Sequence, residues 1–265
     1  FRIVKPVLGY SIQQVLGSFI SNPVKIHTLS YQIILFFCFF GIFYQFYKFL
    51  KRFFTDTTCM LGILLLGIVI PLGITSFWED GDYYTLFFYA WGLNLIFDRK
   101  DYYLPFLILI GTLNRTQIVF ILTFYVIFLF SNKELFRKKS FVIIGLSLAS
   151  FLLAFYSLRL YFGFKINPYP VWHEIESNYS SRFIILQLWT EEIIVFLILS
   201  ILAFKKSSRF FRLSLLSLII YVIFFFFNSI LSQLAKFLPA FLIMIPMSLQ
   251  ALTGESTKVK DDFDN

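Results

Sequence analysis

Residues 213–227 read LSLLSLIIYVIFFFF, a mainly apolar run with two serines and no charged side chain. Arg209 and Arg212 precede it, and the polar pair Asn228–Ser229 follows it. About 20 mainly apolar residues can cross the hydrocarbon core of a bilayer as an α-helix. We therefore expect a membrane-spanning helix over residues 212–228.

The rest of the chain repeats this pattern, with apolar runs separated by short charged or polar segments. The third, fourth and fifth runs are short for a full crossing, which predicts tilted, broken or re-entrant segments. The expected fold is all-α, a polytopic transmembrane helix bundle of about nine spans. The predicted spans are roughly 31–50, 58–77, 83–98, 102–113, 116–131, 141–158, 185–204, 212–228 and 235–252.

Composition supports an integral membrane protein. The 265 residues are 58% hydrophobic and 14% charged, they include 38 Phe, and their mean hydropathy is +0.78. A soluble domain is about 45–50% apolar and about a quarter charged. This chain has too little polar surface to cover a water-soluble globule, and its hydrophobicity also excludes a disordered chain.

The net charge of +8 does not indicate a nucleic-acid partner, because the basic residues form short clusters between apolar runs. Alternating spans place every multi-basic cluster on one side. The positive-inside rule then predicts an extracytoplasmic N-terminus and a cytoplasmic C-terminus. A bacterial inner membrane is expected, and an endoplasmic-reticulum membrane would give the same sidedness. The clusters are Lys48, Lys51 and Arg52; Arg99 and Lys100; Lys133 and 137–139; Lys205, Lys206, Arg209 and Arg212; Lys258 and Lys260.

The predicted organisation has three parts. Residues 1–30 form an extracytoplasmic interfacial segment or a truncated span, and residues 31–252 form the bundle with an outer loop at 159–182. Residues 253–265 form a disordered cytoplasmic tail. The first residue is Phe1 rather than Met, so we expect an upstream part. Cys38 and Cys59 lie in or beside apolar runs and predict no disulfide.

An acidic group lies between the second and third spans, where Glu79, Asp80 and Asp82 fall within four residues. Such carboxylates could act as a general base, or they could bind a divalent cation, the one cofactor that the sequence suggests. The alternative is a solvated acidic turn in which Asp82 caps the next helix. No metal site is assigned.

Asn114-Arg115-Thr116 forms a tight turn between two short apolar segments. Arg115 there could hold a phosphate, because a guanidinium binds two phosphate oxygens at once. The alternative is an interfacial arginine on lipid headgroups. Asn114 is a further candidate for substrate binding.

The region 159–192 supplies three more candidates. His173 in the outer loop is either a substrate-binding or acid–base residue, or an ordinary surface histidine. Glu191 and Glu192 interrupt an apolar stretch. In a straight span they would face a polar cavity; alternatively Thr190 caps a helix that starts there and the preceding segment lies flat in the interface.

The last candidates are Gln233 and Lys236, which share a helical face in the turn before the final span. Lys236 could bind a lipid phosphate. A lysine that extends from the membrane to the interface is the commoner case.

Three short stretches together carry a family resemblance. Asp82 opens a span, residues 109–116 read LIGTLNRT, and residues 236–239 read KFLP at the start of the last span. Over residues 78–131 and 228–250 the chain resembles polytopic GT-C type glycosyltransferases, which have a similar Leu-Asn-Arg turn. Thr116 stands where that turn has an acid. The resemblance implies transfer of a sugar from a polyprenyl-phosphate donor at the extracytoplasmic face, with an outer-loop carboxylate as base.

The expected function is therefore an integral membrane glycosyltransferase with membrane lipids, a lipid-linked sugar and an unidentified acceptor as its partners. Asp80 or Asp82 would deprotonate the acceptor, and Arg115, helped by Lys236, would neutralise the phosphate. A transporter or lipid flippase is the main alternative, and a non-enzymatic membrane subunit is a third. The remaining acid–base candidates are Glu191 and Glu192, and the remaining substrate-binding candidates are Glu79, Asn114, His173 and Gln233.

Overall fold

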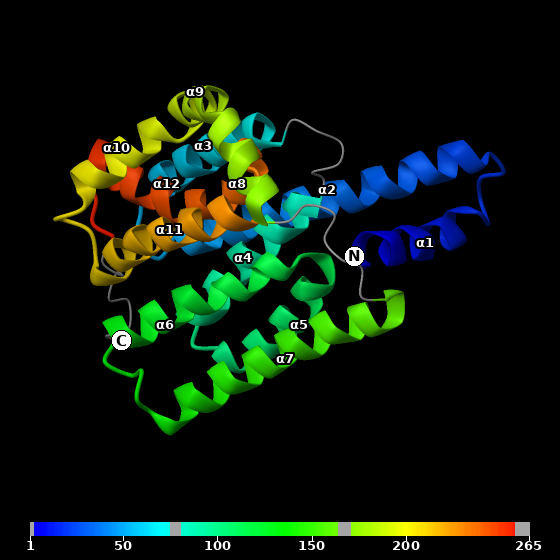
Figure 1. Ribbon diagram of the computed structural model, residues 1–265, viewed down its shortest axis with the longest axis horizontal. Helices are drawn as coiled ribbons and strands as arrows, with labels where there is room; N and C mark the ends of the chain where they lie inside the picture. The colour runs from blue at the N-terminus through cyan, green and yellow to red at the C-terminus, as the bar shows by residue number, and fades with distance from the viewer. Residues whose placement is uncertain (1–2, 75–80, 164–170, 258–265) are drawn as a thin grey trace. The chain divides into compact units, whose positions relative to one another are not determined.

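A computed structural model describes residues 3–74, 81–163 and 171–257, which form helices and no strand (Figure 1). The α-helices are α1 (Val4–Leu16), α2 (Pro23–Leu50), α3 (Asp56–Gly73), α4 (Gly81–Phe97), α5 (Leu104–Asn114), α6 (Ile121–Ser131), α7 (Lys138–Phe162), α8 (Val171–Ser180), α9 (Arg182–Glu192), α10 (Ile194–Ala203), α11 (Arg209–Asn228) and α12 (Leu238–Thr253). The 3₁₀ helices are η2 (Asp101–Tyr103), η3 (Thr116–Phe120) and η4 (Leu234–Phe237).

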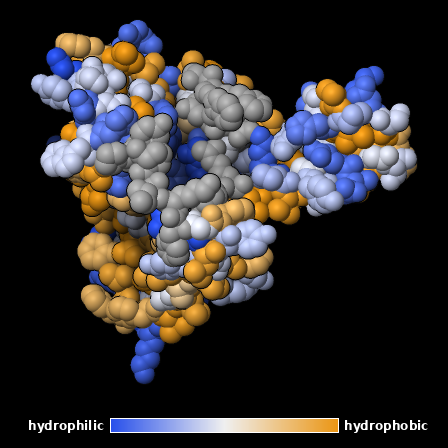
Figure 2. Space-filling view, turned by 45° about the vertical axis from the view of Figure 1, so that its right-hand side comes forward, coloured by the Kyte–Doolittle hydropathy of each residue, from blue (hydrophilic) through white to orange (hydrophobic). Residues whose placement is uncertain are grey.

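Five helical segments in the described part of the chain are long and apolar enough to cross a membrane: α2, α3, α7, α11 and Leu234–Thr253. The pair α9 and α10 would make a sixth span if the two count as one. Apolar side chains occupy much of the surface seen in Figure 2, as expected where a protein exterior meets hydrocarbon.

The all-helical class is confirmed, but the count of about nine spans is not. Each predicted run is helical over most of its described residues, but α4, α5 and α6 are too short to meet the same length test.

The chain divides into two compact units, each described by itself. The first consists of Phe1–Gln45, Asp80–Leu122 and Phe136–Lys165. The second consists of Phe46–Glu79, Thr123–Leu135 and Ile166–Asn265.

In the first unit, α5 packs along α7 and against α4 (Figure 1). The buried face of α7 carries small residues at every seventh position, Ser140, Ser147 and Ala154. Small side chains let two helix backbones approach closely where the surrounding lipid provides no hydrophobic driving force. The opposite face of α7 exposes large apolar side chains such as Leu146 and Leu153. This pattern suits a helix with one face on protein and the other on lipid.

In the second unit, α12 is the central helix, in contact with α3, α10 and α11. The Ser248 hydroxyl of α12 donates to the Phe196 carbonyl of α10 (3.3 Å). The Ser200 hydroxyl of α10 donates to the Met244 carbonyl of α12 (3.2 Å). These bonds join α10 to α12 where no water competes. Gly62 of α3 allows a similarly close approach, since a Cβ there would lie 2.5 Å from a methyl of Leu50.

Residues that follow α12 join three helix ends of the second unit. The Glu255 carboxylate accepts hydrogen bonds from the Thr55 amide (2.8 Å) and the Thr58 hydroxyl at the start of α3. The Thr257 hydroxyl accepts from the Ser208 amide (2.9 Å), just before α11. A disordered tail is predicted from residue 253 onward, but Glu255 and Thr257 are held by these side-chain bonds, and residues 258–265 lie outside the described residues.

The N-terminal boundary also differs from the predicted one. Helix α2 begins at Pro23 rather than at residue 31, because the Asn22 side chain accepts from the amides of Val24 (3.0 Å) and Lys25 (3.2 Å). Such a cap followed by proline is a favoured helix start. Helix α1 pairs with α2 through Gln13 and His27, whose side-chain nitrogens lie 3.1 Å apart.

The predicted outer loop 159–182 is largely helical where the structure describes it. Helix α7 continues to Phe162, α8 occupies Val171–Ser180, and α9 begins at Arg182. Residues 164–170 of this loop lie outside the described residues.

Candidate buried ion-pair site

In the first unit, the candidate residues and the basic clusters lie at opposite ends. Helix α4 runs from Gly81 to Phe97, and α5 returns to Asn114. Asp82 at the start of α4 is therefore beside Arg115 at the end of α5. At the other end, Asp101 pairs with Lys139 (3.0 Å) near the Arg99–Lys100 turn.

Asp82 and Arg115 form a buried ion pair. Arg115 Nη2 lies 2.7 Å from Asp82 Oδ2, and the two side chains are 11% and 1% exposed. Asp82 lies in the first turn of α4, where the helix dipole also favours a negative charge. Arg115 has extended backbone angles that end α5, and its amide donates to the Gly111 carbonyl (2.9 Å). This change of direction points the chain into η3.

Asn114 fastens the two helix ends together. Its Nδ2 donates to the Gly81 carbonyl (2.9 Å) and the Thr85 hydroxyl (3.2 Å), and the side chain is buried. One helical turn further on, Tyr89 donates its hydroxyl proton to the Gln117 carbonyl (2.7 Å). The ion pair therefore lies in a fixed polar cluster within an apolar unit.

Thr85 and Tyr89 also belong to this cluster, although they are not among the predicted site residues. Asp82, Thr85 and Tyr89 are spaced i, i+3 and i+7, which puts them on one helical face. This spacing can be recognised in the sequence, but the residues between the three are mainly apolar, so the segment has the pattern of an ordinary membrane span.

This cluster is suited to hold an oxyanion. A guanidinium has five N–H donors in a planar arrangement that matches carboxylate and phosphate oxygens. Arg115 is also the more accessible member of the pair. An arriving phosphate would meet a cation that is already positioned in surroundings of low dielectric constant, where charge interactions are strong.

Two members of the predicted acidic group, Glu79 and Asp80, lie outside the described residues. The described part of the chain contains no group of three or more His, Cys, Asp or Glu side chains that could hold a metal ion.

In the second unit, the straight span proposed for Glu191 and Glu192 is wrong. Helix α9 ends at Glu192, α10 begins at Ile194, and the two axes differ by 57°. Thr190 donates to the Leu186 carbonyl (2.7 Å) inside α9, so it does not cap α10. Glu191 is exposed and accepts from Gln187 Nε2 (2.9 Å), and Glu192 is half-buried.

His173 is exposed on α8, whereas Asn178 of the same helix is buried. Asn178 Nδ2 donates to the carbonyls of Phe226 (2.9 Å) and Ser229 (2.7 Å), and its Oδ1 accepts from the Leu231 amide (2.8 Å). Both polar atoms of the Asn178 side-chain amide therefore hold α8 against the end of α11. Asn178-Tyr179-Ser180 matches the Asn-X-Ser/Thr sequence for N-glycosylation, but the buried, hydrogen-bonded Asn178 side chain is not accessible for it in this fold.

Gln233 and Lys236 lie in the turn that joins α11 to α12. Gln233 precedes η4 and is half-buried, and Lys236 lies inside η4. Lys236 Nζ contacts the Ser229 hydroxyl, and the Lys236 carbonyl accepts from the Tyr221 hydroxyl (2.8 Å). The lysine is therefore held against the end of α11.

Comparison with protein-family models, curated proteins and solved structures finds no match to this chain. Its function is therefore inferred from the residues and their geometry.

Proposed function

We propose that this chain is an integral membrane glycosyltransferase, similar to the GT-C type, that uses a polyprenyl-phosphate-linked sugar. The observation that carries the proposal is the buried pair Asp82–Arg115 with Asn114. Taking two charges out of water costs several kcal/mol per ion. Ionisable groups inside apolar membrane proteins therefore mark functional sites by default.

The proposed chemistry places the donor phosphate on Arg115. The acceptor hydroxyl oxygen forms a bond to the anomeric carbon while the bond from that carbon to the phosphate oxygen breaks. The hydroxyl proton passes to a carboxylate, Asp80 or Asp82. The negative charge that develops on the departing polyprenyl phosphate is stabilised by the guanidinium, and Asp82 also positions that guanidinium.

The first unit supports an outer location for this chemistry, and the second unit supports the same sidedness for the C-terminal end. In the first, the Ile3 amide donates to the Leu113 carbonyl (3.0 Å), so the start of the chain lies at the Arg115 end, away from Lys139. In the second, Thr257 bonds at the end that carries Lys205 and Lys206. By the positive-inside rule, the N-terminal end is extracytoplasmic and the C-terminal end cytoplasmic, in a bacterial inner membrane.

The test is sugar transfer by a variant that removes both charges together, Asp82→Asn/Arg115→Gln. We expect transfer from a polyprenyl-phosphate sugar to fall about 100-fold or more, because the leaving phosphate loses its counter-charge. The matched control is Lys139→Gln, which breaks a second ion pair whose lysine is 65% exposed, and it should keep near wild-type activity. Full activity in a folded double variant would refute the proposed role.

A transporter or flippase is the second candidate, favoured by the break between α9 and α10 beside Glu191 and Glu192. Discontinuous helices form the substrate sites of many transporters. Vesicles that contain the purified chain separate the two functions. Transfer changes the mass of the donor lipid, whereas transport moves the donor across the bilayer intact.

A further inference from the structure

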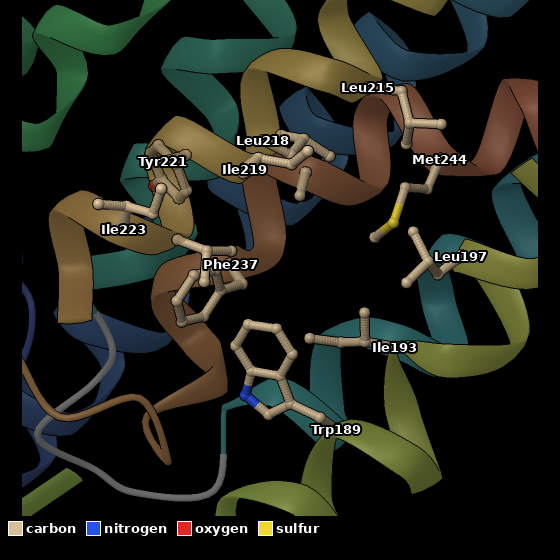
Figure 3. A pocket seen from close by; sticks show the side chains of 12 residues that line it. Trp189, Ile193, Leu197, Leu215, Leu218, Ile219, Tyr221, Ile223, Phe237 and Met244 are labelled. Atoms are coloured by element: carbon tan, nitrogen blue, oxygen red, sulfur yellow. The ribbon is translucent and has the colours of Figure 1, made fainter. Parts of the chain in front are cut away.

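An apolar pocket lies in the second unit among α9, α10, α11 and α12 (Figure 3). It contains about 780 Å³ of empty space, part of it open to the surroundings. Trp189 and Phe237 lie near one end, and Leu215 and Met244 lie near the other. An apolar space of this kind is not a site for ordered water, which needs several polar partners.

The few polar atoms of the lining are already used. Trp189 Nε1 donates to the Leu231 carbonyl (3.2 Å), and the Tyr221 hydroxyl donates to the Lys236 carbonyl (2.8 Å). A ligand in the pocket therefore gains packing with aliphatic and aromatic side chains and no hydrogen bond from these two groups. The matching chemistry is a hydrocarbon chain.

The mouth of the pocket opens on the apolar exterior of the unit. Leu197 of α10 and Ile219 of α11 line the pocket and are 37% and 59% exposed. Helix α11 is long and apolar enough to cross a membrane, and α10 is so together with α9 if the two count as one span, so we infer that the mouth meets the hydrocarbon region. A lipid chain can enter there without crossing water, and phospholipid is the most abundant source of such chains. Mass action favours its binding.

The positive charge of Lys236, next to the lining residue Phe237, favours a lipid with an anionic headgroup. Lys236 directly precedes the lining residue Phe237, and its carbonyl holds the lining residue Tyr221. This ammonium group lies at the end of the unit opposite the Lys205–Lys206 cluster and the C-terminal segment. An anionic lipid would therefore gain an electrostatic attraction here that a zwitterionic lipid with no net charge lacks.

We propose that this pocket binds one acyl chain of an anionic phospholipid, with the headgroup beside Lys236. The pocket belongs to the second unit and the ion pair to the first, and this proposal does not depend on the proposed sugar transfer. The bound lipid fills the space between α10, α11 and α12 and so supports the bent α9–α10 segment around Ile193.

The test is photolabelling of the full chain in vesicles with phosphatidylglycerol that carries a diazirine at the end of one acyl chain. The readout is label in Ala240 and Met244 of α12. Both line the pocket and are buried, so lipid around the outside of the protein does not reach them. We expect label there, and several-fold less with matched phosphatidylcholine.

Two pairs of variants test the position of the mouth and the role of the lysine charge. Leu197→Trp fills the mouth and should abolish label in α12, whereas Ile201→Trp, one turn further along the exposed face, should not. Lys236→Gln should weaken phosphatidylglycerol binding about fivefold, whereas Lys205→Gln at the opposite end should not. Wild-type helical content in each variant shows that the fold is kept.

Three outcomes would overturn the proposal. The first is label on α10 and α11 but none on α12. The second is equal labelling by phosphatidylglycerol and phosphatidylcholine. The third is label on α12 from a polyprenyl phosphate probe alone, which would assign the pocket to a different lipid.

Discussion

Arg115→Ala is expected to destabilise the protein by about 3–5 kcal/mol, because it leaves the carboxylate of Asp82 buried without its cation. Asp82 is 1% exposed, so water cannot replace the guanidinium without opening the joint between α4 and α5. The measurement is the free energy of unfolding in detergent, from denaturant titration followed by circular dichroism.

The double variant Asp82→Asn/Arg115→Gln is the control, because it removes both charges and keeps two polar side chains of similar size. We expect it to cost about 1 kcal/mol, since no ion is left buried alone. If the single and double variants were equally unstable, the loss would come from packing rather than from charge. The double variant is therefore the one that suits functional assays.

Asn178→Ala should lower the free energy of unfolding by about 3 kcal/mol. The substitution removes three hydrogen bonds at once and leaves the Leu231 amide and two carbonyls without this partner in the protein interior. Each buried group left unsatisfied costs about 1–3 kcal/mol, and part of that cost is relieved by local movement. Limited proteolysis between α11 and η4 should speed up in parallel.

Asn228→Ala provides the matched control for this prediction. Asn228 lies at the end of the same helix α11, is exposed, and donates only to the Phe224 carbonyl one turn back (2.9 Å) among the bonds described. Its substitution should change stability by less than about 0.5 kcal/mol. Equal effects of the two substitutions would show that the Asn178 contacts do not hold α8 on α11.

The helical elements could be predicted from the sequence because each apolar run is bounded by charged or polar residues. Lys51–Arg52 follows the end of α2 closely, and Arg99–Lys100 follows the end of α4. The predicted span begins at residue 31, after the observed start of α2 at Pro23, because residues 23–30 contain polar side chains. Asn22–Pro23 is a recognisable start signal for a helix, and it carried more information than hydropathy there.

The bend between α9 and α10 and the helix α8 could not be predicted from local sequence. Residues 183–204 are apolar enough for a continuous span, and the break at Ile193 depends on how α9 meets α3 and α10 meets α12. Helix α8 is polar and short, and Asn178 stabilises it against α11 through contacts distant in sequence.

The charged residues of the candidate site could be predicted from the sequence one by one, but their pairing could not. The sequence marked Asp82 and Arg115 separately, as a possible base and a possible phosphate ligand, because charges are rare in this chain. Only the antiparallel packing of α4 and α5 shows that they form one ion pair. That pairing links their roles, so a single substitution changes stability together with activity and cannot by itself test the catalytic role of either residue.

The most direct test of the central claim is binding of a polyprenyl phosphate to the detergent-purified full chain. We expect the wild type and Lys139→Gln to bind with equal affinity, and Asp82→Asn/Arg115→Gln to bind at least about tenfold more weakly, because a charge-assisted phosphate contact contributes about 1.5–3 kcal/mol. Equal affinity in the double variant, or no binding by well-folded wild type, would contradict a phosphate site at Arg115.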